Sequence, residues 1–166
     1  MELVDPHEIA IRLSRADLKV TPQRLTIYGE LLERDDHPSP ESLYHSVRDD
    51  LPKLSLATVY KTLDALEGAG LISQVSLPNE AKRYDANLEP HHHLVCTSCR
   101  KITDFNDKKF QSLEVQHTES GFRAHSIQVQ VLGLCELCQK ALQTHKSDGE
   151  GTMPSTFYNT TEEKNG

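Results

Sequence analysis

The first half of the chain alternates apolar and polar positions with the period of a helix, in four segments that each begin at a capping residue. Asp5, Thr21 and Ser39 each precede a proline, a pair that commonly starts a helix, and Ser55 precedes the fourth segment. Apolar residues then recur every three or four positions, which is the spacing of one buried helix face. We predict four helices, the last of which ends at Gly70.

Two short alternating segments follow the fourth predicted helix. Residues 71–77 (LISQVSL) and 82–86 (KRYDA) have the alternation of strands, with Pro78 and Asn79 as a turn between them. Helices followed by a hairpin are the element order of a winged helix-turn-helix, in which the helix before the hairpin enters the major groove of DNA. We therefore predict a DNA-binding domain over residues 1–86. A helical module that binds other proteins is the alternative.

The predicted groove helix carries polar and small side chains on the face opposite its leucines. Hydroxyl groups and a lysine on such a face can reach thymine methyls, phosphates and guanine acceptors. A lysine just before the second helix and a Lys-Arg pair in the predicted hairpin add positive charge. The candidate DNA-contacting residues are Lys19, Ser55, Ala57, Thr58, Tyr60 and Lys61.

The pattern changes in the second half, over residues 87–144. We predict strands at 92–96 and 101–105, a helix at 107–120, and a long strand at 122–135. In this last strand, isoleucine and valine alternate with serine and glutamine. A long strand in so small a domain leaves an open edge, which is a common route to symmetric pairing. We predict an α+β chain in which this small α/β domain forms a homodimer.

Composition and charge limit this interpretation. The chain has 166 residues, of which 36% are hydrophobic, and its net charge of −7 means that DNA contact requires a local basic surface. No apolar segment approaches the ~20 residues of a membrane-spanning helix. The acidic N-terminus lacks the order of a signal peptide, which favours a cytoplasmic protein. Residues 145–166 have the polar composition of a disordered tail.

The four cysteines form two Cys-x-x-Cys pairs, Cys96 with Cys99 and Cys135 with Cys138. Each pair can supply two corners of a tetrahedron, so the two pairs together complete the coordination of a structural Zn²⁺. In a reducing compartment such pairs bind metal more often than they form structural disulfides. A redox-active pair or a disulfide is the alternative, although neither motif has thioredoxin-like surroundings.

Three consecutive histidines precede the first cysteine pair. Alternate residues of a strand share a face, so His91 and His93 point together, whereas His92 points away. Asp85 upstream and Asp104 on the next predicted strand can add carboxylate oxygens. Imidazoles with carboxylates suit Fe²⁺ or Mn²⁺ better than a thiolate site does. The alternative is a solvated histidine run without a metal.

Six motifs then occur in a characteristic order: TPQR, SLATVYKTLDALEGAGLI, KRYD, HHHLVCTSC, ITDF and HSIQVQVLGLCELC. In these motifs the chain resembles the ferric uptake regulator family, and most closely its peroxide-responsive branch, over roughly residues 5–142. The resemblance implies a dimeric, metal-dependent transcriptional repressor rather than an enzyme. It further implies a winged-helix half that binds an AT-rich inverted repeat of double-stranded DNA, and a dimerisation half.

The resemblance also implies two metal sites. It places the four cysteines on the structural zinc ligands of the family. It adds His37, which spacing does not identify, and so places the regulatory Fe²⁺ or Mn²⁺ on His37, Asp85, His91, His93 and Asp104. A metal held by this set would tie the DNA-binding half to the dimerisation half. In the peroxide branch, iron and H₂O₂ oxidise a ligand histidine, here His37 or His91, and the repressor releases metal and DNA.

Three other functions remain open at this stage. An iron-uptake regulator usually has glutamates near Asp85 and Asp104, and a further site where this chain has Pro90 and Gln111. A zinc-uptake regulator usually brings a cysteine to its sensing site, but here the structural zinc uses every cysteine. A two-histidine, carboxylate site also resembles that of a non-haem iron oxygenase, yet no substrate-orienting motif accompanies it.

Overall fold

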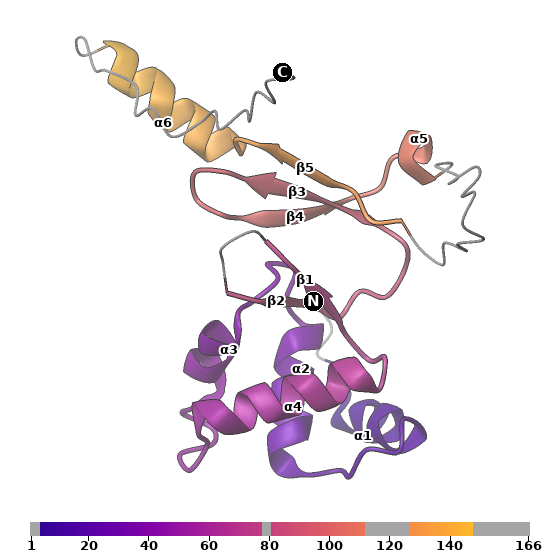
Figure 1. Cartoon of the computed structure of the whole chain (residues 1–166). Coiled ribbons are helices and arrows are strands. Elements are labelled where there is room, and N and C mark those ends of the chain that lie inside the picture. The colour runs from indigo at the N-terminus through magenta and orange to yellow at the C-terminus, as the bar shows by residue number, and fades with distance from the viewer. Residues whose placement is uncertain (1–3, 78–80, 112–126, 148–166) are drawn as a thin grey trace, which may run out of the picture.

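The computed structural model describes residues 4–77, 81–111 and 127–147 (Figure 1). Four helices come first, then a two-stranded hairpin, then a three-stranded sheet with two further helices. The elements in chain order are α1 (Pro6–Arg15), α2 (Pro22–Leu32), α3 (Pro40–Val47), α4 (Leu56–Gly68), β1 (Ser73–Val75), β2 (Arg83–Asp85), β3 (His92–Cys96), β4 (Ile102–Phe105), α5 (Lys108–Gln111), β5 (Gln130–Gly133) and α6 (Glu136–Ser147).

The four predicted helix starts are confirmed by the capping contacts. The side chains of Asp5, Thr21, Ser39 and Ser55 each accept a hydrogen bond from a backbone N–H in the first turn of α1, α2, α3 and α4. Such a cap satisfies a donor that the helix leaves unpaired and is worth about 1 kcal/mol. Gly70 follows the end of α4 with φ of 69°, a left-handed conformation that favours glycine.

Helices α1 to α4 pack around one apolar core. Leu13, Leu31 and Leu63 come from three different helices and have no exposed surface. Burying each of them contributes about 1.5–3 kcal/mol. Tyr84 of β2 is buried in the same core, so the hairpin is anchored to the helices. This arrangement is the winged helix-turn-helix that the sequence predicts.

A second, much smaller core joins the hairpin to the sheet. It contains four buried side chains: Val75 and Leu77 from the hairpin, and Val95 and Ile102 from the sheet. The sheet order is β4-β3-β5, with β3 antiparallel to β4 and parallel to β5. In Figure 1 the hairpin lies between the helices below and this sheet above. The α+β class is therefore confirmed.

Two elements of the second half differ from prediction. In the described part of 122–135 the strand covers only Gln130–Gly133, which lies at an edge of the sheet, and all four of its residues are exposed. The carbonyl of Gly133 accepts from the backbone N–H and hydroxyl of Thr97, and the chain then leaves the strand. Of the helix predicted at 107–120, the structure shows α5, and residues 112–120 lie outside the described residues.

Helix α6 was not predicted. It ends at Ser147, so residues 145–147 are helical although they were assigned to the tail, and residues 148–166 lie outside the described residues. Its leucines, Leu137 and Leu142, are exposed. Without a buried apolar face, a helix leaves only a weak pattern in the sequence. The segment around Cys135 and Cys138 was therefore interpreted only as a metal-binding motif. Within 4–77, 81–111 and 127–147, no helix combines the length and apolar character that crossing a membrane requires.

Candidate metal centres

Four sulfur atoms gather where β3 ends and α6 begins. Cys96 is the last residue of β3, Cys99 lies in the turn after it, and Cys135 and Cys138 flank the start of α6. We call Cys96, Cys99, Cys135 and Cys138 the cysteine cluster; their Sγ atoms all lie within 4.8 Å of one another. All four are free, and Sγ of Cys99 is 3.6 Å from Sγ of Cys135, well beyond the ~2.05 Å of a disulfide.

The local backbone favours negative charge on the first of these sulfurs. The N–H groups of Cys99 and Cys135 donate to Sγ of Cys96 at 3.5 and 3.4 Å. Burial opposes ionisation, but these donors and that of Ser98 outweigh it and lower the pKa of Cys96 to about 6. A hydrogen bond from Ser98 favours the thiolate of Cys138, but the neighbouring sulfurs of Cys135 and Cys99 raise its pKa to about 11. Four sulfurs this close need a cation to ionise together, and the donor set suits Zn²⁺.

A second cluster lies between the two halves of the chain. Its members are His37 from the α2–α3 loop, Asp85 at the end of β2, His91 just before β3, His93 in β3 and Asp104 in β4. One nitrogen or oxygen of each lies within 4.8 Å of those of the others. We call these five residues the histidine–aspartate cluster. The structure thus brings together all five residues that the resemblance implied.

Two carboxylate oxygens and three imidazole nitrogens converge in this cluster. Oδ2 of Asp85 is 2.9 Å from Nε2 of His91, and Oδ1 of Asp104 is 2.8 Å from Nε2 of His37. Nε2 of His93 is 3.7 Å from the first oxygen and 3.8 Å from the second. The side chain of Asp104 is 36% exposed, whereas the other four residues are buried. The cluster is therefore reached from solvent on the Asp104 side.

The polar atoms of the cluster are not satisfied by one another. Both ring nitrogens of His37 and Oδ2 of Asp85 are buried without a hydrogen-bond partner among the described residues, because their close contacts are poorly directed. Nε2 of His91 lies 2.9 Å from Nε2 of His93. Buried unpaired groups and facing lone pairs cost free energy, which a bound cation would remove. Nitrogen with carboxylate oxygen is the donor set of Fe²⁺ and Mn²⁺, so the residues fit such a metal.

The hydrogen bonds behind the cluster point its nitrogens inward. Nδ1 of His91 lies 2.7 Å from the carbonyl of Glu89, which can only accept, so Nδ1 carries the proton and Nε2 of the neutral ring is free to bind metal. His92 points the opposite way, as predicted: its ring packs against Phe105 and Phe110. The predicted division of the histidine run is confirmed.

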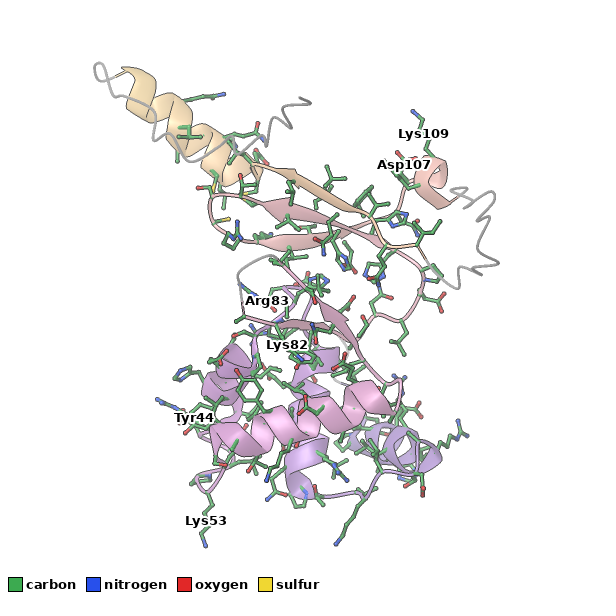
Figure 2. The ribbon with its side chains drawn as sticks, viewed as in Figure 1. Tyr44, Lys53, Lys82, Arg83, Asp107 and Lys109 are labelled. Carbon is green, nitrogen blue, oxygen red and sulfur yellow. The ribbon has the colours of Figure 1, made fainter. Side chains whose placement is uncertain are left out.

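His37 is held in its place by contacts from β2. Its φ is 52°, a conformation uncommon for a residue with a side chain. The carbonyl of His37 accepts from Nη1 of Arg83 at 3.3 Å, and the carbonyl of Pro38 accepts from the N–H of Tyr84 at 3.1 Å. Figure 2 shows Arg83 and Lys82 on the hairpin between the helices and the second sheet. The side chain of Arg83 thus positions the His37 loop, although the sequence suggested a role toward DNA.

The carboxylates and imidazoles shift each other's pKa values. Burial lowers the pKa of His37, but the carboxylates of Asp85 and Asp104 outweigh burial and raise it. Burial raises the pKa of Asp85, but His37, His93 and the N–H of Asn87 outweigh burial and hold it well below its usual range. The cluster therefore keeps a carboxylate anion in a buried position, where a divalent cation is favoured.

Sequence comparison assigns the chain to a family. A model described as the ferric uptake regulator family matches residues 15–132, which is more than half of the chain. The chain belongs to the ferric uptake regulator family. The peroxide-responsive repressor PerR of Staphylococcus aureus is 30% identical over 129 residues, which cover 76% of this chain and 86% of PerR.

Solved structures of the ferric uptake regulator family have the same fold. The structure of Fur from Helicobacter pylori is described as having three functional metal binding sites. It matches with a TM-score of 0.67 and 26% identity, and the match covers 84% of this chain and 97% of the Helicobacter pylori chain. That of the ferric uptake regulator from Francisella tularensis with iron has a TM-score of 0.64 and 30% identity, with coverage of 74% and 95%.

The predicted DNA-contacting residues all belong to the helical half, and all but one of them lie on α4 or cap it. Lys19 lies between α1 and α2, Ser55 caps α4, and the other predicted residues lie on α4. Thr58 is half-buried. The exposed residues are Lys19, Ser55, Ala57, Tyr60 and Lys61. The hydroxyl of Tyr60 donates to Oε1 of Glu41 at 2.6 Å, a contact that sequence reasoning missed. This contact joins the side chains of α4 and α3.

Proposed function

We propose that this chain is a dimeric, metal-dependent transcriptional repressor that senses peroxide. Zn²⁺ occupies the cysteine cluster, and Fe²⁺ or Mn²⁺ occupies the histidine–aspartate cluster as corepressor. The observation that supports this proposal most strongly is that the five residues of the histidine–aspartate cluster come from both halves of the chain. Two of them, His37 and Asp85, belong to the winged-helix half, and three, His91, His93 and Asp104, belong to the half with the second sheet.

A metal bound by both halves selects one arrangement of the DNA-reading helices. A ligand shifts an equilibrium toward the conformation to which it binds more tightly, and here only an arrangement with both halves close offers all five atoms. Coupling of this kind is worth about 1–3 kcal/mol, or about 5–150-fold in affinity. We expect Mn²⁺ to raise the affinity for an AT-rich inverted repeat by a factor in this range.

The exposed apolar surface of the second half supports a dimer. Among the described residues, the leucines and valines of β3, β5 and α6 that are exposed are Leu94, Val131, Leu132, Leu137 and Leu142. Leu94 of β3 and Val131 of β5 are paired in register and so lie on the same face of the sheet. Neighbouring exposed apolar side chains of this kind favour an interface with a second chain. A two-fold dimer would place two copies of α4 at the half-sites of an inverted repeat.

Peroxide sensing rests on the chemistry of the buried histidines. Bound Fe²⁺ would activate H₂O₂ for this reaction. Overall, a ligand imidazole would lose two electrons and gain one oxygen atom of the peroxide, and the other oxygen atom would leave as water. His37 and His91 are the candidate targets. An oxidised ring binds metal more weakly, so the two halves separate and DNA is released. Mn²⁺ supports DNA binding without this reaction.

The test compares the two metals under peroxide. The protein is loaded anaerobically with Fe²⁺ or with Mn²⁺, bound to a labelled duplex with an AT-rich inverted repeat, and treated with H₂O₂. We expect release from DNA of the iron form only, and one added oxygen on the peptide that carries His37 or His91. If the iron and manganese forms leave DNA equally slowly, the chain is an iron-responsive regulator and the peroxide proposal fails.

A further inference from the structure

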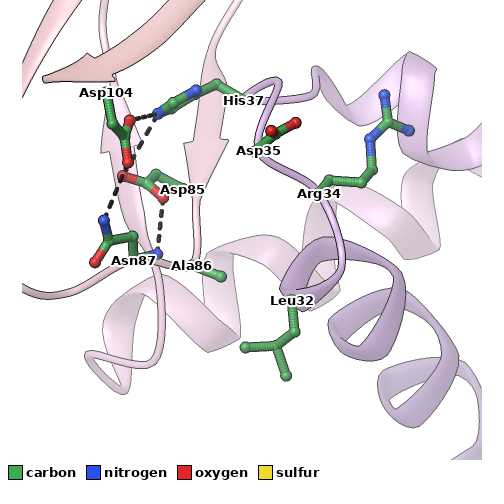
Figure 3. A pocket seen from close by; sticks show the side chains of 8 residues that line it. All are labelled: Leu32, Arg34, Asp35, His37, Asp85, Ala86, Asn87 and Asp104. Carbon is green, nitrogen blue, oxygen red and sulfur yellow. Dashed lines mark hydrogen bonds and ion pairs between the residues drawn. The ribbon is translucent and has the colours of Figure 1, made fainter. Parts of the chain in front are cut away.

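Asn87 lies between the two carboxylates of the histidine–aspartate cluster and is hydrogen-bonded to both. Its backbone N–H donates to Oδ1 of Asp85 at 2.7 Å, and its side-chain Nδ2 donates to Oδ2 of Asp104 at 3.0 Å (Figure 3). We propose that Asn87 is a positioning residue, which leaves each carboxylate only one oxygen with which to bind the metal. This inference rests on the proposed function, because it concerns the same metal.

The oxygens that Asn87 leaves free are the two that face the histidines. Oδ2 of Asp85 lies 2.9 Å from His91, and Oδ1 of Asp104 lies 2.8 Å from His37. A hydrogen bond to one oxygen of a carboxylate fixes its orientation and weakens that oxygen as a ligand, which favours binding of a metal through the other oxygen. A divalent metal held in this way would be bound by five protein atoms, one from each residue of the cluster.

Asn87 is itself held in a row of hydrogen bonds that joins every second residue from 85 to 91. The N–H of Glu89 donates to Oδ1 of Asn87 at 3.1 Å, and Nδ1 of His91 donates to the carbonyl of Glu89 at 2.7 Å. The carbonyl oxygen of the amide therefore faces Glu89 and its NH₂ faces Asp104, which settles the orientation of the side chain. The row has a metal ligand at each end, Asp85 and His91, and Asn87 joins it to a third, Asp104.

A cavity adjoins this side of the cluster. Its volume is about 290 Å³, and Asn87 and Ala86 line it together with the α2–α3 loop, His37 and both carboxylates. Figure 3 shows the amide of Asn87 beside Asp85 and Asp104 on the wall of this cavity. A small molecule that enters from the cavity meets the cluster where Asn87 restrains the carboxylates. The histidine–aspartate cluster thus adjoins a cavity on the side where Asn87 lies.

The test removes the amide and measures the metal directly. Asn87→Ala and Asn87→Leu both remove the bond to Asp104, and Asn87→Leu keeps the approximate size. Leu88→Ala is the matched control, because Leu88 lies in the same linker and is 54% exposed. Partners of metal-binding carboxylates typically contribute about 10–100-fold to affinity, so we expect the Mn²⁺ dissociation constant to rise by that factor in both Asn87 variants and to stay unchanged in Leu88→Ala.

Cobalt reports the coordination number. The d–d absorption bands of Co²⁺ weaken as coordination rises, so a carboxylate freed to bind through both oxygens makes them weaker in the Asn87 variants. A Mn²⁺ affinity within twofold of wild type and an unchanged Co²⁺ spectrum would overturn the inference. A loss of zinc in the Asn87 variants would also overturn it. So would a melting temperature, measured with zinc bound but without Mn²⁺, that is lower than that of Leu88→Ala. Either result indicates a purely structural role. If wild type itself binds neither ion at the cluster, it is the proposed function that fails.

Discussion

The cysteine cluster and the histidine–aspartate cluster differ in how much of the chain each one joins. The cysteine cluster takes all its residues from one half, at the ends of β3 and β5 and the start of α6. The histidine–aspartate cluster takes its residues from both halves and is buried except at Asp104. A metal in the first can only stabilise the half that holds it. A metal in the second can change how the two halves are arranged, which is what a regulator requires.

The small core explains why the second half needs a metal at all. Among the described residues of the sheet, only Val95 and Ile102 are in its apolar cluster, and the remaining two members belong to the hairpin. Cores of this size rarely supply sufficient stability without a disulfide or a structural metal. In the part of the helical half that the structure describes, thirteen buried residues form the core, and such a core does not need a metal. Removal of one metal and then the other should therefore have unequal effects.

The largest effect is expected when a cysteine is lost. Cys96 is 4% exposed, and its sulfur accepts two backbone N–H groups. Binding of structural zinc is worth about 10–16 kcal/mol in small zinc domains, which exceeds what the small core can replace. We expect Cys96→Ser to lose zinc and the dimer together, as measured by metal analysis and sedimentation. The exposed neighbour Lys101→Ser is the control, and a stable, zinc-free dimer of Cys96→Ser would contradict the structural role.

An intermediate effect is expected when the ligand from the winged-helix half is lost. Asparagine tolerates the left-handed backbone of His37, so His37→Asn removes the ligand with little strain. We expect zinc content and melting temperature to remain near wild type. Loss of a residue that only supports a metal ligand typically costs about 10–100-fold in affinity, so loss of a ligand itself should lower the Mn²⁺ affinity by about 100-fold or more. Metal-dependent DNA binding should then disappear.

The exposed histidine of α3 provides the matched control for that experiment. His45→Asn makes the same chemical change away from both clusters and should bind Mn²⁺ and DNA as wild type does. Fluorescence anisotropy of a labelled duplex, titrated with Mn²⁺, measures both variants. Mn²⁺-dependent DNA binding that persists in His37→Asn would show that the two halves are not coupled through this ligand.

The smallest effect is expected from the salt bridge that orders the His37 loop. Nη2 of Arg34 lies 2.6 Å from Oδ2 of Asp36, and its side chain also donates to Ser42. Because the pair is partly exposed, we expect Arg34→Met to cost about 1 kcal/mol and to weaken Mn²⁺ binding a few-fold, without change in zinc. Arg48→Met, which removes a more exposed pair with Asp49, should change neither. Urea unfolding measures the stability of the two variants, and titration measures their Mn²⁺ affinity. Equal Mn²⁺ affinities of Arg34→Met and Arg48→Met would show that the order of the His37 loop does not affect metal binding.

Features that depend on near neighbours in the chain were predictable. The caps at Asp5, Thr21, Ser39 and Ser55, and the opposite directions of His92 and its two neighbours, follow from helix and strand geometry over a few residues. The strand predicted at 122–135 is confirmed at Gln130–Gly133, but in its described part it is shorter than predicted, because alternation does not show where a strand stops pairing with its neighbour.

Asn87 could have been suspected from its spacing. Asp85, Asn87, Glu89 and His91 alternate along the chain, with polar groups at every second position between the hairpin and the histidine run. Nothing in that spacing, however, indicates the bond from Asn87 to Asp104 on β4. The alternation is equally typical of a polar linker, whereas in the fold Asn87 is hydrogen-bonded to two carboxylates.

The sequence by itself determined the four capped helices, the hairpin, the paired cysteines and the shared face of His91 and His93. Only the tertiary structure decided that His37 meets these histidines, that Arg83 holds the carbonyl of His37, and that Asn87 reaches Asp104. The physical reason is the range of the interactions. Capping and strand alternation act over a few residues, whereas these contacts join segments that lie close only after the helical core and the sheet have packed together.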